Sequence, residues 1–185
     1  AGYAKGADGV YTSPADGRVV IEVLSTGGGT GDTERSSTAS DWRKAGFDAQ
    51  ERNLPQALSL DGLTRASFPG LSLTAQSATD TAMSAAFATA QIGRPENRWN
   101  GINRGGYSNP EYDRVVDAFN SVLDPNERIQ QRAAMAKIIS DDLPGLLLYY
   151  NLQPAPHVAA LTGPTPTGSD ATGYVTWNIL DWDLL

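Results

Sequence analysis

The chain has 185 residues, of which 21 are acidic and 14 are basic, so its formal net charge at pH 7 is −7. The basic residues are scattered along the chain, which argues against a nucleic-acid surface and against docking on anionic lipid. The absence of cysteine excludes disulfides, a thiolate nucleophile and a cysteine-ligated zinc site. An apolar content of 40% is ordinary for a globular protein, and the length favours one domain.

Residues 18–54 predict the opening of an α/β fold. Arg18 to Ser25 is apolar and β-branched enough for a central strand. A weak helix is predicted from about Asp32 to Lys44, and Phe47 to Leu54 alternates as a second strand does. Strand, helix and strand in this order predict a parallel pair with a right-handed crossover. The intervening Gly-rich turn lacks the spacing of a P-loop or a dinucleotide fingerprint, so it predicts a flexible connection.

The middle of the chain is harder to interpret. A short strand is predicted near Leu63 to Phe68. Asp80 to Ile92 predicts a helix whose inward residues are Met83, Ala86, Phe87 and Ala90. Pro95 to Ser108 is a long loop, and loops on a rigid scaffold often face a binding cleft.

Two helices with strong start signals follow. Asn109-Pro110-Glu111 opens the first helix, with Asn as the N-cap and Pro at the first helical position. The same signal recurs at Asp124, and the second helix ends near Asp142 because Pro144 disfavours helical geometry at Leu143. The first helix has an apolar stripe at Tyr112, Val115, Val116, Phe119, Val122 and Leu123. The second has a predicted core face at Ile129, Ala133, Ala136 and Ser140, widened by Met135, Ile138 and Ile139.

The end of the chain predicts three strands. Leu146 to Tyr150 is apolar and too short for a membrane helix, so it predicts an interior strand. A short strand is expected at His157 to Leu161, and a closing strand at Tyr174 to Asn178. No signal peptide, lipid-attachment motif or transmembrane run is visible in the sequence.

The amino-acid sequence between Asn100 and Tyr150 resembles that of the C-terminal lobe of family 5 extracytoplasmic solute-binding proteins. These are the oligopeptide, dipeptide and nickel receptors of ABC importers. The matching positions are Asn103, Gly106, Tyr107, Asn109, Pro110, Glu111, Asp113, Asp124, Arg128, Asp142, Pro144 and Tyr149. An Asn-Pro-Glu helix cap is common by itself, whereas this ordered set over about fifty residues is much more specific.

The resemblance implies an α/β fold, a single lobe of the periplasmic-binding-protein-like type (type II, cluster C) with a mixed sheet flanked by helices. It implies a C-terminal ligand-binding lobe over residues 1–160 and a tail over residues 161–185 that returns to the first lobe of the full-length protein. The opening Ala1-Gly2-Tyr3 is similar to a segment deep inside longer family members. The chain is therefore expected to be an excised piece that lacks the signal and the N-terminal lobe.

The function implied is solute capture for an ABC importer. The lobes would close around a peptide or a similar small solute outside the cytoplasmic membrane, with no enzymatic step and no cofactor. The implied partners are the solute, the transmembrane permease subunits and the missing N-terminal lobe. The implied location is the periplasm, or the outer face of a bacterial membrane as an anchored lipoprotein. Two alternatives stay open: a protein-interaction module that binds no solute, and a hydrolase of unrecognised type.

The candidate ligand-binding residues are Arg65, Phe68, Asn103, Arg104 and Tyr107. Peptide-binding family members typically carry a Trp and then an Asp that pairs with the peptide amino terminus, and this chain has no Trp followed by an Asp between residues 55 and 78. This departure argues against ordinary peptide recognition. An anionic or an apolar-aromatic group suits Arg65 and Phe68 better. The alternatives are Phe68 in the core, Arg65 as a solvated charge, and the other three as residues that order their loop.

No catalytic or metal site is predicted. The one histidine, His157, is expected to be structural, and a single His without Cys rules out a multi-His metal site. Asp141 and Asp142 point to different faces at a helix end, so they are expected to be solvated. Paired acids of the glycosidase type are not indicated by the sequence.

Overall fold

The structure is a computed structural model, and it describes residues 2–77, 79–151, 154, 156–165 and 176–184. The chain forms two compact units. The first comprises Ala1–Ala75 and Gly93–Arg104, and the second comprises Gln76–Ile92 and Gly105–Leu185. The division into a lobe of residues 1–160 and a tail of residues 161–185 stays a prediction.

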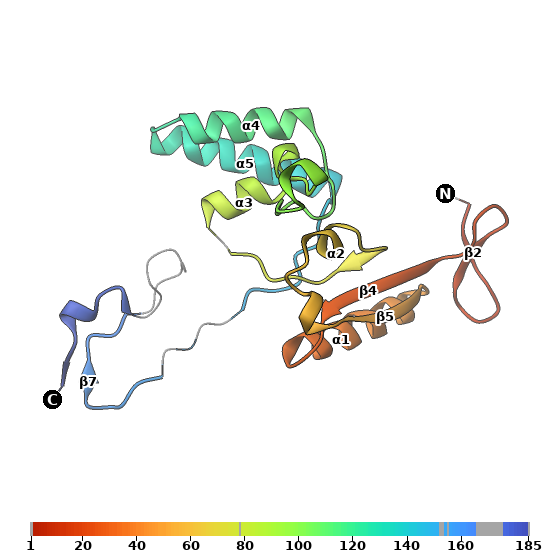
Figure 1. Cartoon of the computed structure of the whole chain (residues 1–185), viewed down its shortest axis with the longest axis horizontal. Helices are drawn as coiled ribbons and strands as arrows, with labels where there is room; N and C mark the ends of the chain where they lie inside the picture. Colours follow the sequence, from red (N-terminus) through yellow and green to blue (C-terminus); the bar gives the residue numbers. More distant parts are fainter. Residues whose placement is uncertain (1, 78, 152–153, 155, 166–175, 185) are drawn as a thin grey trace. The chain divides into compact units, whose positions relative to one another are not determined.

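The first unit is built on a three-stranded parallel sheet. Its central strand β4 (Val20–Thr26) pairs with β5 (Asp48–Leu54) along its whole length and with β6 (Leu71–Ser72) on its other edge. Helix α1 (Thr30–Ala45) connects β4 to β5 and packs against both strands (Figure 1). The predicted strand, helix and parallel strand are confirmed.

The core of the first unit explains why β4 is central. Val23, Leu24 and Ser25 are all buried, as expected for a strand that is covered on both faces. Val23 packs with Ala39 of α1 and Ala49 of β5. In the Gly-rich turn before α1, a side chain of the same protein accepts a backbone N–H: the amide of Gly28 donates to Asp32 Oδ2 at 2.9 Å. This contact fits the predicted plain connection.

The pairing of β6 with β4 depends on the glycine that precedes β6. Gly70 has a φ of +93°, and a Cβ added there would lie 2.6 Å from the carbonyl oxygen of Glu22. No real Cβ tolerates that separation, and the positive φ also disfavours side chains. The residue at position 70 therefore decides whether the third strand can join the sheet.

A small antiparallel sheet precedes the parallel one. It consists of β1 (Ala4–Lys5), β2 (Tyr11–Ser13) and β3 (Gly17–Arg18), in that order. Arg18 Nε donates to Asp48 Oδ2 at 2.8 Å, which links this sheet to the start of β5. The chain therefore contains both parallel and antiparallel pairs, and the α/β class is confirmed.

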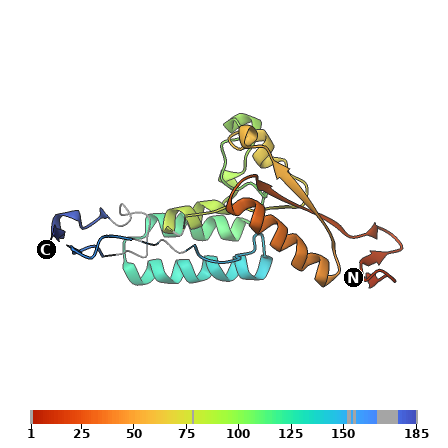
Figure 2. The same ribbon diagram turned by 90° about the horizontal axis from the view of Figure 1, so that it is seen from below.

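The second unit is helical. Its helices are α3 (Asp80–Ala86), α4 (Pro110–Ser121) and α5 (Pro125–Asp142), and α4 and α5 lie side by side in both views (Figures 1 and 2). The four buried residues of α4 are Tyr112, Val115, Val116 and Phe119, all members of the predicted stripe. Leu123, also assigned to that stripe, is 93% exposed in the turn after α4.

The predicted core face of α5 is wrong in part. Met135 is buried, and Ile138 and Ile139 pack against the same core, as expected. Ile129 is 63% exposed, and the positions predicted beside it (Ala133, Ala136 and Ser140) are exposed as well. The packed face is rotated away from Ile129, because the core of this unit contacts the side of α5 that carries Ala134, Met135, Ile138 and Ile139.

Two predictions in the middle of the chain need correction. The expected strand near Leu63 to Phe68 is helix α2 (Gly62–Ala66), because Asp61 Oδ1 accepts the Thr64 N–H and caps a helical turn. The expected helix to Ile92 ends at Ala86 and is followed by the 3₁₀ turn η2 (Thr89–Gln91). Of its predicted inward residues, Ala86 and Phe87 are half-buried, whereas Met83 and Ala90 are exposed.

Leu146 to Tyr150 is not an interior strand. Its five residues form no strand and are between 53% and 72% exposed. An apolar run becomes a strand only where a sheet edge accepts it. The described strands of the second unit are β7 (Leu161–Thr162) and β8 (Asp183–Leu184), which pair with each other.

The remaining predictions concern the end of the chain. The strand expected at His157 to Leu161 begins only at Leu161. The predicted closing strand falls partly outside the described residues, and residues 177 and 178 form a turn before the 3₁₀ turn η6 (Ile179–Asp181). Within the described parts of the chain, no helix combines the length and apolarity needed to cross a membrane.

Candidate functional site

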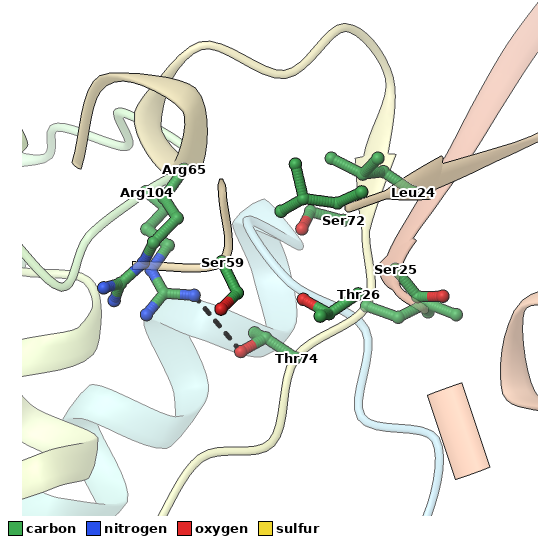
Figure 3. A pocket seen from close by; sticks show the side chains of 10 residues that line it. Leu24, Ser25, Thr26, Ser59, Arg65, Ser72, Thr74 and Arg104 are labelled. Carbon is green, nitrogen blue, oxygen red and sulfur yellow. Dashed lines mark hydrogen bonds between the residues drawn. The ribbon is translucent and has the colours of Figure 1, made fainter. Parts of the chain in front are cut away.

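A small pocket lies at the carboxyl ends of the parallel strands in the first unit (Figure 3). Ligands of open α/β sheets commonly bind outside this edge, because the loops that leave it can supply polar groups. The pocket is lined by Leu24, Ser25, Thr26, Leu54, Ser59, Arg65, Ser72, Leu73, Thr74 and Arg104. Its volume is about 50 Å³, and about 10–15 Å³ is enough for one water molecule. It therefore has room for a small polar group.

Helix α2 positions Arg65. The helix begins at the Asp61 cap and approaches the segment around Trp99 so closely that a Cβ on Gly62 would lie 2.9 Å from the Trp99 carbonyl oxygen. Arg98 and Trp99 both have positive φ, at 55° and 60°. Non-Gly residues in this conformation are uncommon and often occur at functional sites. This close packing fixes the helix that carries the arginine.

The turn after a buried asparagine positions Arg104. Asn103 is only 2% exposed, and the Arg104 N–H donates to the Ile102 carbonyl oxygen at 3.0 Å. Arg104 Nη1 lies 3.4 Å from Thr74 Oγ1, a long hydrogen bond (dashed in Figure 3). Arg104 Nε is buried and has no hydrogen-bond partner in the described structure. A buried donor left unsatisfied is costly, which suggests that a further acceptor belongs there.

The electrostatics of the pocket differ from those of the whole chain. Two of its lining residues are arginines and none is Asp or Glu, although the chain has seven more acids than bases (21 − 14). Neither Arg65 nor Arg104 forms an ion pair with any residue that the structure describes. By contrast, Arg52 pairs with Glu22 at 2.9 Å on the same sheet. The pocket is therefore a local positive site in an acidic protein.

Hydroxyl groups cover much of the remaining wall. Ser25 Oγ is already engaged, since it donates to the Gly31 carbonyl oxygen and accepts from Arg35 Nη1, each at 2.8 Å. Ser59 Oγ donates to the Gln56 carbonyl oxygen at 2.7 Å. Thr26 and Ser72 add two further hydroxyls at the ends of β4 and β6. The arrangement offers hydrogen-bond donors and no anionic acceptor.

The structure brings two of the five predicted ligand-binding residues together in this pocket, Arg65 and Arg104. Phe68 is half-buried and does not line it, and the side chain of Asn103 is buried in the loop. Tyr107 belongs to the second unit, where its hydroxyl donates to Asp142 Oδ2. The predicted set is therefore not a single constellation, and its role in binding stays a prediction.

Tyr107 has a clear structural environment. Its ring lies edge-on to those of Phe87 and Tyr112, with centroids 6.2 Å and 6.1 Å away. Burial, followed by the hydrogen bond to Asp142, raises the pKa of Tyr107. The hydrogen bonds from Tyr107 and Asn109 lower the pKa of Asp142. The Tyr107 to Asp142 contact thus joins the start of α4 to the end of α5.

Sequence reasoning missed the hydroxyl residues of the pocket, namely Ser25, Thr26, Ser59, Ser72 and Thr74. Thr26 closes β4, and Thr74 follows β6 by two residues. The available signal was a hydroxyl residue at the end of a predicted parallel strand. It was detectable at β4, whereas β6 was not predicted at all.

The wall of the pocket combines guanidinium and hydroxyl groups. Among the residues that the structure describes, no group of three or more His, Cys, Asp or Glu side chains could hold a metal ion. His157 is exposed in the second unit. Paired guanidinium groups and hydroxyls can hold an anionic oxygen group through charge-assisted hydrogen bonds.

Comparison with known proteins gives matches at the level of structure. No protein-family model and no curated protein matches the chain. The oligopeptide-binding protein from Thermus thermophilus, solved with a pentapeptide, is 25% identical over 77% of this chain, with a TM-score of 0.64. NikZ from Campylobacter jejuni, solved with Ni(L-His), is 19% identical over 98% of the chain, with a TM-score of 0.70.

A third match is the mannohexaose-bound periplasmic oligopeptide-binding protein of an ABC transporter from Thermotoga maritima, 23% identical over 81% of the chain with a TM-score of 0.64. The chain spans only 26%, 36% and 29% of the length of these three proteins, in the order given. All three are solute-binding proteins of the type that the sequence pattern resembles. The predicted resemblance is therefore confirmed: the fold of this chain is similar to one part of these family 5 solute-binding proteins.

Proposed function

We propose that this chain forms one lobe of the solute-binding component of an ABC importer. One observation carries the proposal: the fold matches solute-binding proteins, and its pocket lies at the sheet edge where such folds bind ligands. The lobe would supply one wall of the solute site, and closure of a second lobe would supply the other. No chemical step is part of the proposal.

The proposed setting follows from the same comparison. The solute would be captured outside the cytoplasmic membrane, either in the periplasm or by a lipoprotein anchored on the outer face. The closed protein would then deliver the solute to the transmembrane permease subunits. The matched structures hold a pentapeptide, Ni(L-His) and mannohexaose, so the fold accommodates chemically different solutes.

Native mass spectrometry of the protein purified from its host without denaturation tests the proposal. We expect a bound small molecule that is lost after unfolding and refolding. A ladder of peptide masses would indicate peptide capture, and a single mass would indicate a defined solute. A protein that carries no ligand and binds no component of the host's growth medium would contradict the solute-binding role.

A protein-interaction module is the second candidate, favoured by the exposed apolar run Leu146 to Tyr150. Leu147 is 72% exposed and Leu148 is 54% exposed, and contiguous exposed apolar residues often mark interaction surfaces. Sedimentation velocity would compare the unmodified chain with a Leu147→Asp, Leu148→Asp variant. Association that persists at micromolar concentration and is lost in the variant would favour this candidate.

A further inference from the structure

We propose that the pocket binds an oxyanion group of the solute, a carboxylate or a phosphate, between Arg65 and Arg104. The inference rests on the proposed function for its biological setting and deepens it by naming the class of solute. It selects one of the two ligand types that the sequence left open, since Arg65 lines the pocket whereas Phe68 does not.

The charge of the pocket is unbalanced. Two guanidinium groups that share a pocket of about 50 Å³ repel each other, and no carboxylate lines the wall to compensate them. The structure describes no ion pair for either arginine, although it describes ion pairs for others, such as Arg35 with Asp32 at 2.8 Å. An anion placed between the two groups would remove the repulsion.

The hydrogen-bond donors of Arg104 also point to an anion. Among the residues that the structure describes, Arg104 Nε is buried without a partner, and its Nη1 makes only the 3.4 Å contact to Thr74. A guanidinium presents donors in a planar fork that matches the two oxygens of a carboxylate or phosphate. Figure 3 shows both arginine side chains on the same side of the pocket, and hydroxyls of Ser59 and Thr74 lie near them. An oxyanion would satisfy the guanidinium donors of both arginines together, whereas the Ser59 hydroxyl already donates to the Gln56 carbonyl oxygen.

The volume of the pocket limits which part of a solute it can hold. A volume of about 50 Å³ holds a few water molecules, so it accepts one ionic group and not a whole peptide or sugar. The rest of the solute would lie outside the pocket. A positively charged amino terminus is disfavoured here, because the lining contains no acid to pair with it. The pocket thus selects the anionic end of its ligand.

The test begins with the unmodified protein. Acetate and inorganic phosphate are titrated separately while the arginine Nε–H signals are followed by NMR. We expect both anions to shift the signals of Arg65 and Arg104 in a saturable way, and the tighter of the two identifies the oxyanion. Equal, non-saturating shifts at all arginines would show salt screening only and would overturn the inference.

Variants make the assignment specific. Arg65→Gln and Arg104→Gln should each weaken anion binding by roughly tenfold or more, because each removes charge-assisted hydrogen bonds. Arg104→Lys keeps the charge without the planar fork, and we expect it to bind more weakly than the unmodified protein and more tightly than Arg104→Gln. The matched control is Arg114→Gln, on α4 of the second unit with a side chain that is 72% exposed, and it should bind as the unmodified protein does. Circular dichroism spectra verify that each variant is folded.

The outcome is separable from the fate of the proposed function. A neutral bound solute in native mass spectrometry, together with no saturable anion response, overturns the anionic class and leaves solute binding intact. Saturable anion binding at the arginines in a protein that captures no solute supports the oxyanion site and contradicts the transport role. An anionic solute whose binding is weakened by Arg65→Gln and Arg104→Gln supports both.

Discussion

Four residues stabilise the α4–α5 pair, and all four belong to the sequence pattern that resembles the family. Asn109 Oδ1 accepts the N–H groups of Glu111 and Tyr112, and its Nδ2 donates to Asp142 Oδ2 at 2.9 Å. Asp124 caps α5, and Arg128 Nη1 donates to the carbonyl oxygens of Phe119 and Val122 at the end of α4. These residues satisfy helix-end groups that would otherwise lack partners. The pattern therefore marks a helical hairpin, while the candidate pocket is lined by residues of the other unit.

Replacing the N-cap of α4 tests this role. Asn109→Ala removes the acceptor for two helix N–H groups, and we expect it to lower the free energy of unfolding by about 1 kcal/mol. Urea denaturation followed by far-UV circular dichroism measures the change. Asn120→Ala, at an exposed position in the last turn of the same helix, is the control and should be neutral or slightly stabilising. An equal shift for both variants would contradict the capping role.

The lowered pKa of Asp142 predicts that the protein loses stability in acid. Hydrogen bonds from Tyr107 and Asn109 lower its pKa in the folded state, so the folded protein binds fewer protons than the unfolded one near that pKa. Its contribution is present above the unfolded pKa, about 3.9, and is lost as the pH falls through the folded pKa. We expect the thermal midpoint of Asp142→Asn to fall less than that of the unmodified protein between about pH 5 and about pH 2.

The control for this pH dependence is Asp117→Asn, an exposed carboxylate on α4. Its curve should run parallel to that of the unmodified protein. If Asp142→Asn loses as much stability in acid as the unmodified protein does, the contact with Tyr107 and Asn109 is not the source of the acid sensitivity.

At the scale of elements, β6 depends on one backbone position. Gly70→Val would place a β-branched side chain at a φ of +93° and against the Glu22 carbonyl oxygen. We expect the variant to lose the pairing of β6 with β4, at a cost of roughly 1–3 kcal/mol in local stability. Hydrogen exchange should report this at the Leu73 N–H, which donates to the Leu24 carbonyl oxygen at 2.8 Å.

The matched control for β6 is Gly105→Val. A Cβ added at Gly105 meets nothing within 4 Å, and its φ is not in the left-handed region. Exchange at Leu73 should stay slow in this variant. Protection at Leu73 that survives Gly70→Val would mean that the strand tolerates the side chain by moving, and the glycine requirement would be wrong.

The success of sequence reasoning also varies by element. Local signals were sufficient for β4, a β-branched apolar run, and for β5, which alternates. They were also sufficient for α4, which has a cap and an apolar stripe, and for the weaker α1, which ends at Gly46. They failed at Leu146 to Tyr150, since an apolar run records only a tendency to be buried and the structure leaves it exposed. They also failed at α2, where a single cap at Asp61 turns a five-residue segment into a helix.

The candidate site was predictable only in its charged members. Arg65 and Arg104 lie 39 positions apart (104 − 65) and meet in one pocket through the packing of α2 and the loop before Arg104. The sequence suggested Phe68, Asn103 and Tyr107 as well, and the structure places none of these three in the wall of that pocket. Tertiary packing decides which loop residues converge, and no local pattern encodes it.

At the scale of the whole molecule, the affinity of this chain for its solute is predicted from how much of the length of the matched structures it covers. The chain spans 26% to 36% of the length of the first two structures described above, so it would supply only part of the solute contacts. Two charge-assisted interactions are worth roughly 1.5–3 kcal/mol each before the cost of immobilising the ligand. A millimolar Kd corresponds to about −4 kcal/mol and a micromolar Kd to about −8 kcal/mol.

The isolated chain is therefore expected to bind its solute weakly, with a Kd in the millimolar range or above. Isothermal titration with the solute found by native mass spectrometry measures this directly, and acetate is the reference for the isolated anionic group. Similar affinities for solute and acetate would mean that the arginine pair supplies nearly all the binding energy of this chain. Micromolar binding of the solute would require contacts worth about 4 kcal/mol more, the difference between the two values above. The pocket would then be only part of a larger binding surface on this chain, and closure by a second lobe would not be needed for capture.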